Sequence, residues 1–342
     1  MTYASEIADT SHRGSFVSVN IIMFLLGIVS GAALGMIFTW YEVALFSDGL
    51  LLLAAFIVPF LPESPTFLVV TDRHTQAAEI LRRLRGYNCN IENEILMIKE
   101  MNNTETKSTW RDIFRGDNIK RLLILFGLFC VQSFSGVHVL RSNLTRILQS
   151  AGINSDLELW TTVILLVPVG GSILQTLLID RLGRRLCLVV SLAPTTVFCF
   201  SLGVFSCLYD QVEPNGYNDL HASNGSGFNE TGQVDTGSTG QDVTLWFPVL
   251  FLSACILGMH SGIEALPWQL SSEYFTTTMR PMGITISNVL GCLVIATSMQ
   301  CYSLMRDSLT MAGLYFFYST VAFLGIIFTL FCVPETTGEN IG

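Results

Sequence analysis

The sequence predicts an all-α integral membrane protein with eight transmembrane helices. Half of the 342 residues are hydrophobic and only 13% are charged, against about 25% in ordinary soluble domains. The mean hydropathy is correspondingly high, at +0.52, so the chain has too little charge to cover a soluble surface of this size. Eight apolar runs are long enough to cross a bilayer, and they lack the alternating pattern of barrel strands.

Each apolar run predicts one spanning helix, because a helix in hydrocarbon satisfies its own backbone hydrogen bonds. The predicted spans are Phe16–Phe38, Val43–Leu61, Leu122–Leu140, Trp160–Ile179, Leu186–Leu208, Leu245–Trp268, Met282–Leu304 and Thr310–Val333. Between the second and third spans, residues 71–120 are charged and have a helical pattern of apolar positions. This segment is therefore expected to be a helical linker outside the membrane.

The basic residues predict that both termini are cytosolic. With the first residues inside, all but three of the 18 Lys and Arg residues fall on the inner side, as the positive-inside rule requires. The exceptions are Arg141, Arg146 and Arg306. The sequence TLLIDRLGRRLCLVV, residues 176–190, then forms a tight cytosolic hairpin whose turn is supplied by Gly183. Its charged residues are Asp180, Arg181, Arg184 and Arg185.

The segment from residue 209 to 243 is predicted to be an extracellular loop. It contains no Lys or Arg, is rich in Gly, Ser, Asn and Asp, and carries two N-glycosylation sequons, at Asn224 and Asn229. Such a composition cannot bury a core and is typical of a flexible, glycosylated loop.

Other function classes receive little support from the sequence. The nine cysteines have no C-x-x-C spacing and mostly lie in apolar runs, so we expect no metal site and no disulfide framework. No nucleophile triad or phosphate-binding loop is present, so we expect no cofactor and no enzymatic activity. The net charge of −9 and the scattered basic residues argue against a nucleic-acid partner.

Six segments together resemble one family. They are YASEIADTSHRGS from Tyr3, LPESPTFLV from Leu61, AAEILRRLRGYN from Ala77, DRLGRRL from Asp180, PWQLSSEYFTTTMR from Pro267 and VPETTGEN from Val333. In order and spacing they resemble the sugar porter branch of the major facilitator superfamily, and insect facilitated trehalose transporters are the most similar group. The resemblance implies alternating-access transport of a hexose or a trehalose-like disaccharide, in a multi-pass protein of the plasma membrane.

The resemblance also implies a domain organisation. Family members have twelve spans in two bundles, and the segment that matches Glu6–Gly14 joins spans four and five. Residues 1–61 would then be the last two spans of the N-terminal bundle, residues 62–121 the cytosolic linker, and residues 122–342 a complete six-span C-terminal bundle. Spans one to four are expected to be absent from this chain, which alone is expected not to carry sugar.

A cytosolic gate is predicted at the inner helix ends. Four acidic residues fall there, within reach of basic residues, and such pairs can hold one conformation closed and release it in another. The predicted gate comprises Glu6, Arg13, Glu63, Asp180, Arg181, Arg184, Arg185, Glu273, Arg280 and Glu335. Alternatively, the hairpin arginines only anchor the topology.

Substrate-binding residues are predicted where the chain matches the family's sugar-binding segments. The stretch CVQSFSGVHVLRSN resembles Q-Q-x-S-G-I-N: Gln132 and Ser135 match, Ser133 replaces the second amide and His138 replaces the Asn. The remaining predicted contacts are Trp268 and Asn288. Other positions depart from the pattern, with Pro168 in place of an Asn and Glu264 in place of a Gly.

Two further features allow alternative interpretations. His260 and Glu264 lie one turn apart and could couple protons to transport, or Glu264 could simply pair with His260. Glycines 27, 31 and 35 repeat at four-residue spacing, which favours close helix packing over substrate contact.

Two functions thus stay open. The first is facilitative sugar transport, with a small-molecule sugar and the lipid bilayer as partners. The second is a membrane protein of the same fold that does not transport, acting as a sensor, as a partner of itself or of a full-length porter, or as an incomplete gene product.

Overall fold

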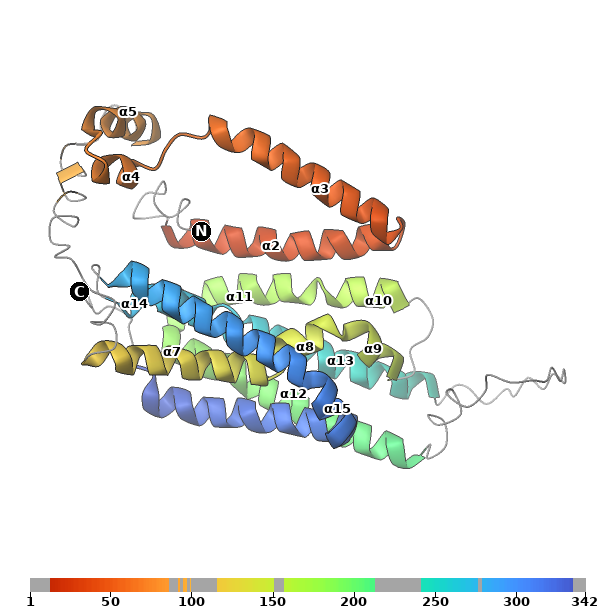
Figure 1. Ribbon diagram of the computed structural model, residues 1–342. Coiled ribbons are helices and arrows are strands. Elements are labelled where there is room, and N and C mark those ends of the chain that lie inside the picture. Colours follow the sequence, from red (N-terminus) through yellow and green to blue (C-terminus); the bar gives the residue numbers. More distant parts are fainter. Residues whose placement is uncertain are drawn as a thin grey trace.

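The computed structural model shows helices and no strands in the part of the chain that it describes. That part comprises residues 13–85, 92, 95–96, 99, 116–150, 157–212, 241–275 and 279–334. The helices run side by side along a common direction, with two of them, α2 and α3, on one side of a larger bundle (Figure 1). The all-α fold class predicted from the sequence is confirmed.

The first two helices form a hairpin, α2 (Arg13–Gly35) and α3 (Trp40–Ile57), followed by the short 3₁₀ helix η1 (Val58–Phe60). Thr39 begins α3 with a capping interaction, because its backbone N–H and its hydroxyl both donate to Glu42 Oε2, at 2.9 and 2.7 Å. α2 packs against α10 and α11. α3 lies outside α2 and has no buried residue.

The glycine repeat in α2 does not mediate close packing in this structure. A Cβ atom placed on Gly27, Gly31 or Gly35 would meet nothing within 4 Å. The prediction that these glycines bring helices together is therefore wrong for the described contacts, because no neighbouring atom comes close enough to require the absence of a Cβ atom.

A small separate core forms in the linker. α4 (Pro65–Val70) and α5 (His74–Arg85) bury Leu68, Val69 and Ala77 against each other. Ser64 caps α4, since its Oγ accepts a hydrogen bond from the Phe67 N–H at 3.3 Å. The helical character that the sequence predicted within residues 71–120 is confirmed for α5.

The main bundle contains the remaining helices. They are α7 (Asp117–Phe134), α8 (Val137–Ser142), α9 (Leu144–Ser150), α10 (Leu157–Ile164), α11 (Val167–Leu182), α12 (Arg184–Val212), α13 (Gln241–His260), α14 (Leu266–Glu273) and α15 (Arg280–Cys332). α15 consists of two arms that meet at Thr310, whose φ of 62° and ψ of 169° are not helical (Figure 1).

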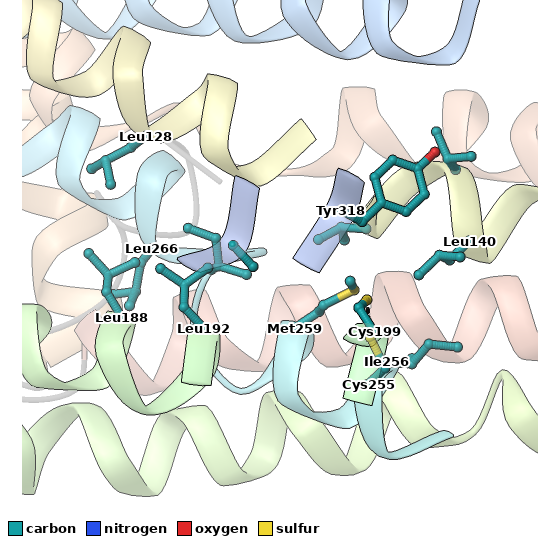
Figure 2. Close-up of a cluster of buried hydrophobic side chains, with 14 of the residues drawn as sticks. Leu128, Leu140, Leu188, Leu192, Cys199, Cys255, Ile256, Met259, Leu266 and Tyr318 are labelled. Carbon is teal, nitrogen blue, oxygen red and sulfur yellow. Dashed lines mark hydrogen bonds between the residues drawn. The ribbon is translucent and has the colours of Figure 1, made fainter. Parts of the chain in front are cut away.

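The bundle core is a continuous apolar cluster whose buried residues come from α7, α8, α9, α10, α12, α13, α14 and α15. Figure 2 shows part of this cluster, including Leu192 and Cys199 of α12, Cys255 and Met259 of α13 and Tyr318 of α15. Cys199 and Cys255 lie with their sulfur atoms 3.2 Å apart and behave as small apolar side chains. All eight cysteines in the described residues are free.

The chain is a multi-pass membrane protein. Five of its described helical stretches are long and apolar enough to cross a membrane, the last of them Met282–Cys332, and two shorter apolar helices, Ile21–Gly35 and Trp246–His260, accompany them. Because the last stretch contains both arms of α15, it corresponds to two of the predicted spans. The count of eight spans stays a prediction.

Three of the predicted spans are interrupted along their length. The first break, at Ser135–Gly136, separates α7 from α8, where Gly136 adopts φ 94°. The second, at residues 165–166, separates α10 from α11, which begins with Pro168 in its first turn. The third, at residues 261–265, separates α13 from α14. Such breaks free backbone groups inside the membrane, which is tolerated where the groups are buried in protein or line a cavity.

Candidate binding site and gate

The candidate binding site forms where the break between α7 and α8 meets the break between α13 and α14. Gln132, near the end of α7, is fully buried. Its Nε2 donates to the backbone oxygen of Glu264 at 2.7 Å and to Glu264 Oε2 at 3.2 Å. The irregular backbone of residues 261–265 thus finds a polar partner in the neighbouring span, so the two breaks stabilise each other.

Glu264 is at the centre of a buried charged cluster. Its Oε1 lies 3.6 Å from Arg141 Nη1, and its Oε2 lies 4.0 Å from His138 Nε2. The three side chains are only 11–19% exposed. Both basic residues come from α8, three positions apart and therefore on one helix face.

Arg141 is a site residue that the sequence did not predict, because its place near the outer end of a span indicates only a basic residue on the outer side. Its spacing from His138 was the available signal.

His260 extends the cluster toward α11. It is buried, its Nδ1 lies 3.0 Å from the Ile256 carbonyl oxygen, and its Nε2 has no hydrogen-bond partner among the described residues. α11 approaches closely there because residue 171 is glycine: a Cβ atom at that position would lie 2.8 Å from His260 Cβ. The interpretation that Glu264 pairs with His260 is replaced by the ion pairs with Arg141 and His138.

The site contains buried polar atoms that make no hydrogen bond within the described structure. Besides His260 Nε2 they include Gln132 Oε1, Ser133 Oγ, His138 Nε2 and Arg141 Nη1. Gln175 Nε2 on α11 and Asn288 Oδ1 on α15 are also buried without a hydrogen-bond partner in the described structure. Buried polar groups are normally satisfied, and each unsatisfied one costs about 1–3 kcal/mol. Such a collection is typical of a site that binds water or a polar ligand.

The other residues predicted to bind substrate are Ser135, Trp268 and Asn288. Ser135 is buried, but its hydroxyl donates to the Gln132 carbonyl at 2.9 Å and so contributes to the end of α7. Trp268, on α14, stacks edge-on against Phe129 with ring centroids 4.9 Å apart. Phe129 also fits against Gly291 of α15, one turn beyond Asn288, so α7, α14 and α15 converge there.

At the opposite end of α14, Arg184 and Glu273 form a two-point ion pair. Arg184 Nε and Nη2 donate to Glu273 Oε2 and Oε1, at 3.2 and 3.1 Å. Arg184 begins α12 and Glu273 ends α14, so the pair joins two helix ends. Beside it, Arg121 of α7 donates to the Tyr274 carbonyl at 2.7 Å.

Comparison with known proteins agrees with this architecture. The family model described as "Sugar (and other) transporter" matches residues 1–341. The chain belongs to this family of sugar transporters. Among its curated relatives are the facilitated trehalose transporter Tret1 of Apis mellifera ligustica, 22% identical over 99% of the chain, and the sugar transporter ERD6-like 1 of Arabidopsis thaliana, 28% identical over 99%.

The chain spans 63% of the length of the bee transporter and 68% of that of the plant transporter. Among solved structures, the bromodeoxyglucose-bound proton:xylose symporter XylE of the major facilitator superfamily matches with a TM-score of 0.70 and 19% identity. That match covers 98% of the chain and 67% of XylE. An inward-open XylE structure matches with a TM-score of 0.69. The fold is therefore of the major facilitator type.

The other residues of the predicted cytosolic gate take different places in this chain. Arg185 donates to the carbonyl of Leu330 on α15 and so binds a helix rather than a carboxylate. Arg181 and Glu63 are exposed. Glu6, Glu335 and the sequon residues Asn224 and Asn229 lie outside the described residues, as do the side chains of Arg13, Asp180 and Arg280.

Replacing Arg184 with Ala is expected to lower the free energy of unfolding by about 1–2 kcal/mol, because Glu273 loses both hydrogen bonds while staying partly shielded from water. Arg181→Ala, at the exposed neighbouring position, is the matched control and should change it by less than about 0.5 kcal/mol. Equilibrium unfolding in mixed micelles measures both. If the two changes lower the free energy of unfolding equally, the ion pair of Arg184 with Glu273 contributes no more to stability than an unpaired surface arginine does.

Proposed function

We propose that this chain provides the C-terminal wall of a sugar-binding site and the cytosolic gate for facilitative transport by alternating access. The substrate would be a hexose or a trehalose-like disaccharide. The observation that supports this most directly is the set of unsatisfied buried polar atoms at the helix breaks.

These atoms suit a polyhydroxylated ligand because they include both donors and acceptors. Arg141 Nη1 can only donate, whereas a neutral His260 whose Nδ1–H is directed at the Ile256 carbonyl presents Nε2 as an acceptor. Each sugar hydroxyl can donate one hydrogen bond and accept others, so one sugar ring can satisfy several of these groups together. Trp268 adds an aromatic surface beside them.

The arrangement of the helices supports alternating access. Discontinuous spans around a midplane site are typical of secondary transporters, in which one bundle moves against the other. The ion pair of Arg184 with Glu273 lies at the ends of α12 and α14, where it can stabilise one closed arrangement of the inner side. Arg185, bound to the end of α15, would add to the same closure.

The proposed setting is the plasma membrane with both termini in the cytosol. Residues 1–61 would belong to the N-terminal bundle, residues 62–121 to the linker and residues 122–342 to the C-terminal bundle. The loop at 209–243 would be extracellular and carry glycan at Asn224 or Asn229. A deglycosylation shift on gels that disappears when both residues are changed to Gln would support this orientation, and an unaltered shift would contradict it.

Sugar uptake into liposomes tests the function. In the described structure α2 packs against the bundle, whereas α3 lies outside α2 and buries none of its residues. We therefore expect saturable uptake of glucose or trehalose when the chain follows the first four spans of a trehalose transporter relative, and none by the 342-residue chain alone. Gln132→Leu should abolish uptake, whereas Thr297→Val, at an exposed position on α15, should leave it unchanged.

Two results would contradict the proposal. Absence of uptake in both contexts would favour the membrane protein that does not transport. Uptake that persists in Gln132→Leu would place the binding site elsewhere.

A further inference from the structure

The binding site of this chain contains more basic groups than a neutral sugar requires. His138 and Arg141 from α8 and His260 from α13 surround one acidic residue, Glu264. His138 and His260 are 9% and 1% exposed. Buried ionisable groups within membrane spans are costly and usually mark a functional site, and the guanidinium group of Arg141 is the permanent positive charge here that needs an anionic partner.

Glu264 satisfies Arg141 only in part. The closest approach of their ion pair is 3.6 Å, which is too long for a hydrogen bond. Arg141 Nη1 is buried and has no hydrogen-bond partner in the described structure. The guanidinium group therefore has attraction for the carboxylate of Glu264 but retains an unused donor inside the site. A guanidinium group binds a carboxylate best through two parallel hydrogen bonds.

Glu264 has other partners that would keep its charge stabilised if Arg141 bound a second anion. Its Oε2 accepts a hydrogen bond from Gln132 Nε2 and faces His138. Residues 261–265, which carry Glu264, are not part of a regular helix and can adjust more readily than a helical turn.

We propose that Arg141 forms a subsite for the carboxylate of a sugar acid, such as a uronate, and that Glu264 occupies this subsite when no substrate is bound. This inference rests on the proposed function, because the sugar ring would lie against the same polar atoms and Trp268. A sugar acid is then preferred over the neutral sugar from which it derives. The remaining hydroxyl groups satisfy Gln132, Ser133 and His260.

Ligand binding by the purified 342-residue chain in detergent tests the subsite. The ligands are D-glucuronate, D-glucose and acetate, measured by calorimetry on the unaltered chain and on three variants. We expect glucuronate to bind about tenfold or more tightly than glucose, which corresponds to one charge-assisted hydrogen bond. Acetate should not bind measurably, because it lacks the hydroxyl groups.

The variants separate the roles of the two charges. Glu264→Gln should tighten glucuronate binding, because it removes the internal competitor. Arg141→Gln should abolish the preference for glucuronate, so the ratio of the glucuronate and glucose affinities should fall to about one. The double change Arg141→Gln/Glu264→Gln leaves no buried charge unpaired, so it should fold and still show no preference, even if Arg141→Gln alone is unstable.

Each contrary outcome has a distinct meaning. Glucose binding without preference for glucuronate would overturn the subsite and leave the sugar-binding function intact. Binding of acetate as tightly as glucuronate would overturn the sugar-acid assignment in favour of a general carboxylate site. Failure of all three ligands to bind would overturn both the subsite and the sugar-binding role of this chain.

Discussion

Replacing Arg141 with Met is expected to lower the free energy of unfolding by about 3–5 kcal/mol, the effect typical of removing one partner of a buried ion pair. Glu264 would then keep one side-chain hydrogen bond, from Gln132, and the nearby His138, but no permanent positive charge. Equilibrium unfolding in mixed micelles measures the loss. It should be several times larger than that of Arg146→Met, an exposed arginine one helix further along.

The double change of Arg141 to Met and Glu264 to Leu shows whether charge is the cause. With both charges gone, no buried ion is left without a partner, and the cost of moving two ions out of water disappears. The double variant should therefore be at least about 2 kcal/mol more stable than Arg141→Met alone. If the two variants are equally unstable, the Arg141 side chain contributes packing rather than charge, and the ion pair has no energetic role.

Hydropathy and the low content of charged residues predicted that these residues lie in membrane-spanning helices, because both are properties of composition. A run of about 20 apolar residues reports the thickness of the bilayer, so the helices lie where the apolar runs predicted them. The breaks within three spans were not predicted. They depend on contacts such as that of Gln132 with the Glu264 backbone, which join residues far apart in the chain.

The charged residues were harder to interpret because one side chain can serve two purposes. Arg141 counted as an outer basic residue, yet its guanidinium group lies inside the bundle against Glu264. Arg184 does pair with a predicted gate carboxylate, Glu273, whereas Arg185 binds the end of α15. Local sequence identifies a basic cluster at a helix end, but only the packing of α12, α14 and α15 decides which partner each arginine meets.

The glycines show the same limit. The regular repeat at residues 27, 31 and 35 predicted close packing, but those positions have open space around them. Glycines outside this repeat, such as Gly171 and Gly291, lie where another helix leaves no room for a Cβ atom. Sequence spacing therefore identifies a regular glycine pattern. Where two helices come close enough to require a glycine depends on which helices are neighbours in the fold.

Replacing Gly136 with Ala is expected to lower the free energy of unfolding by about 2–4 kcal/mol. Its φ of 94° is strained for any residue with a Cβ atom, which costs about 1–2 kcal/mol. The added Cβ would also lie 2.7 Å from the ring of Tyr318, which is only 2% exposed and cannot move aside. The remaining cost comes from this overpacking.

Two further variants divide that effect between backbone and packing. In the Gly136→Ala/Tyr318→Ala pair the steric conflict is removed, so the coupling between the two changes should be favourable by about 1 kcal/mol or more, while the backbone strain stays. Gly170→Ala is the matched control, because a Cβ atom there would meet nothing within 4 Å and the backbone at Gly170 does not have a positive φ. Because α8 begins directly after Gly136 and carries His138 and Arg141, Gly136→Ala should also weaken ligand binding, which the control should not. A neutral Gly136→Ala in both unfolding and binding would mean that the break between α7 and α8 does not position the site.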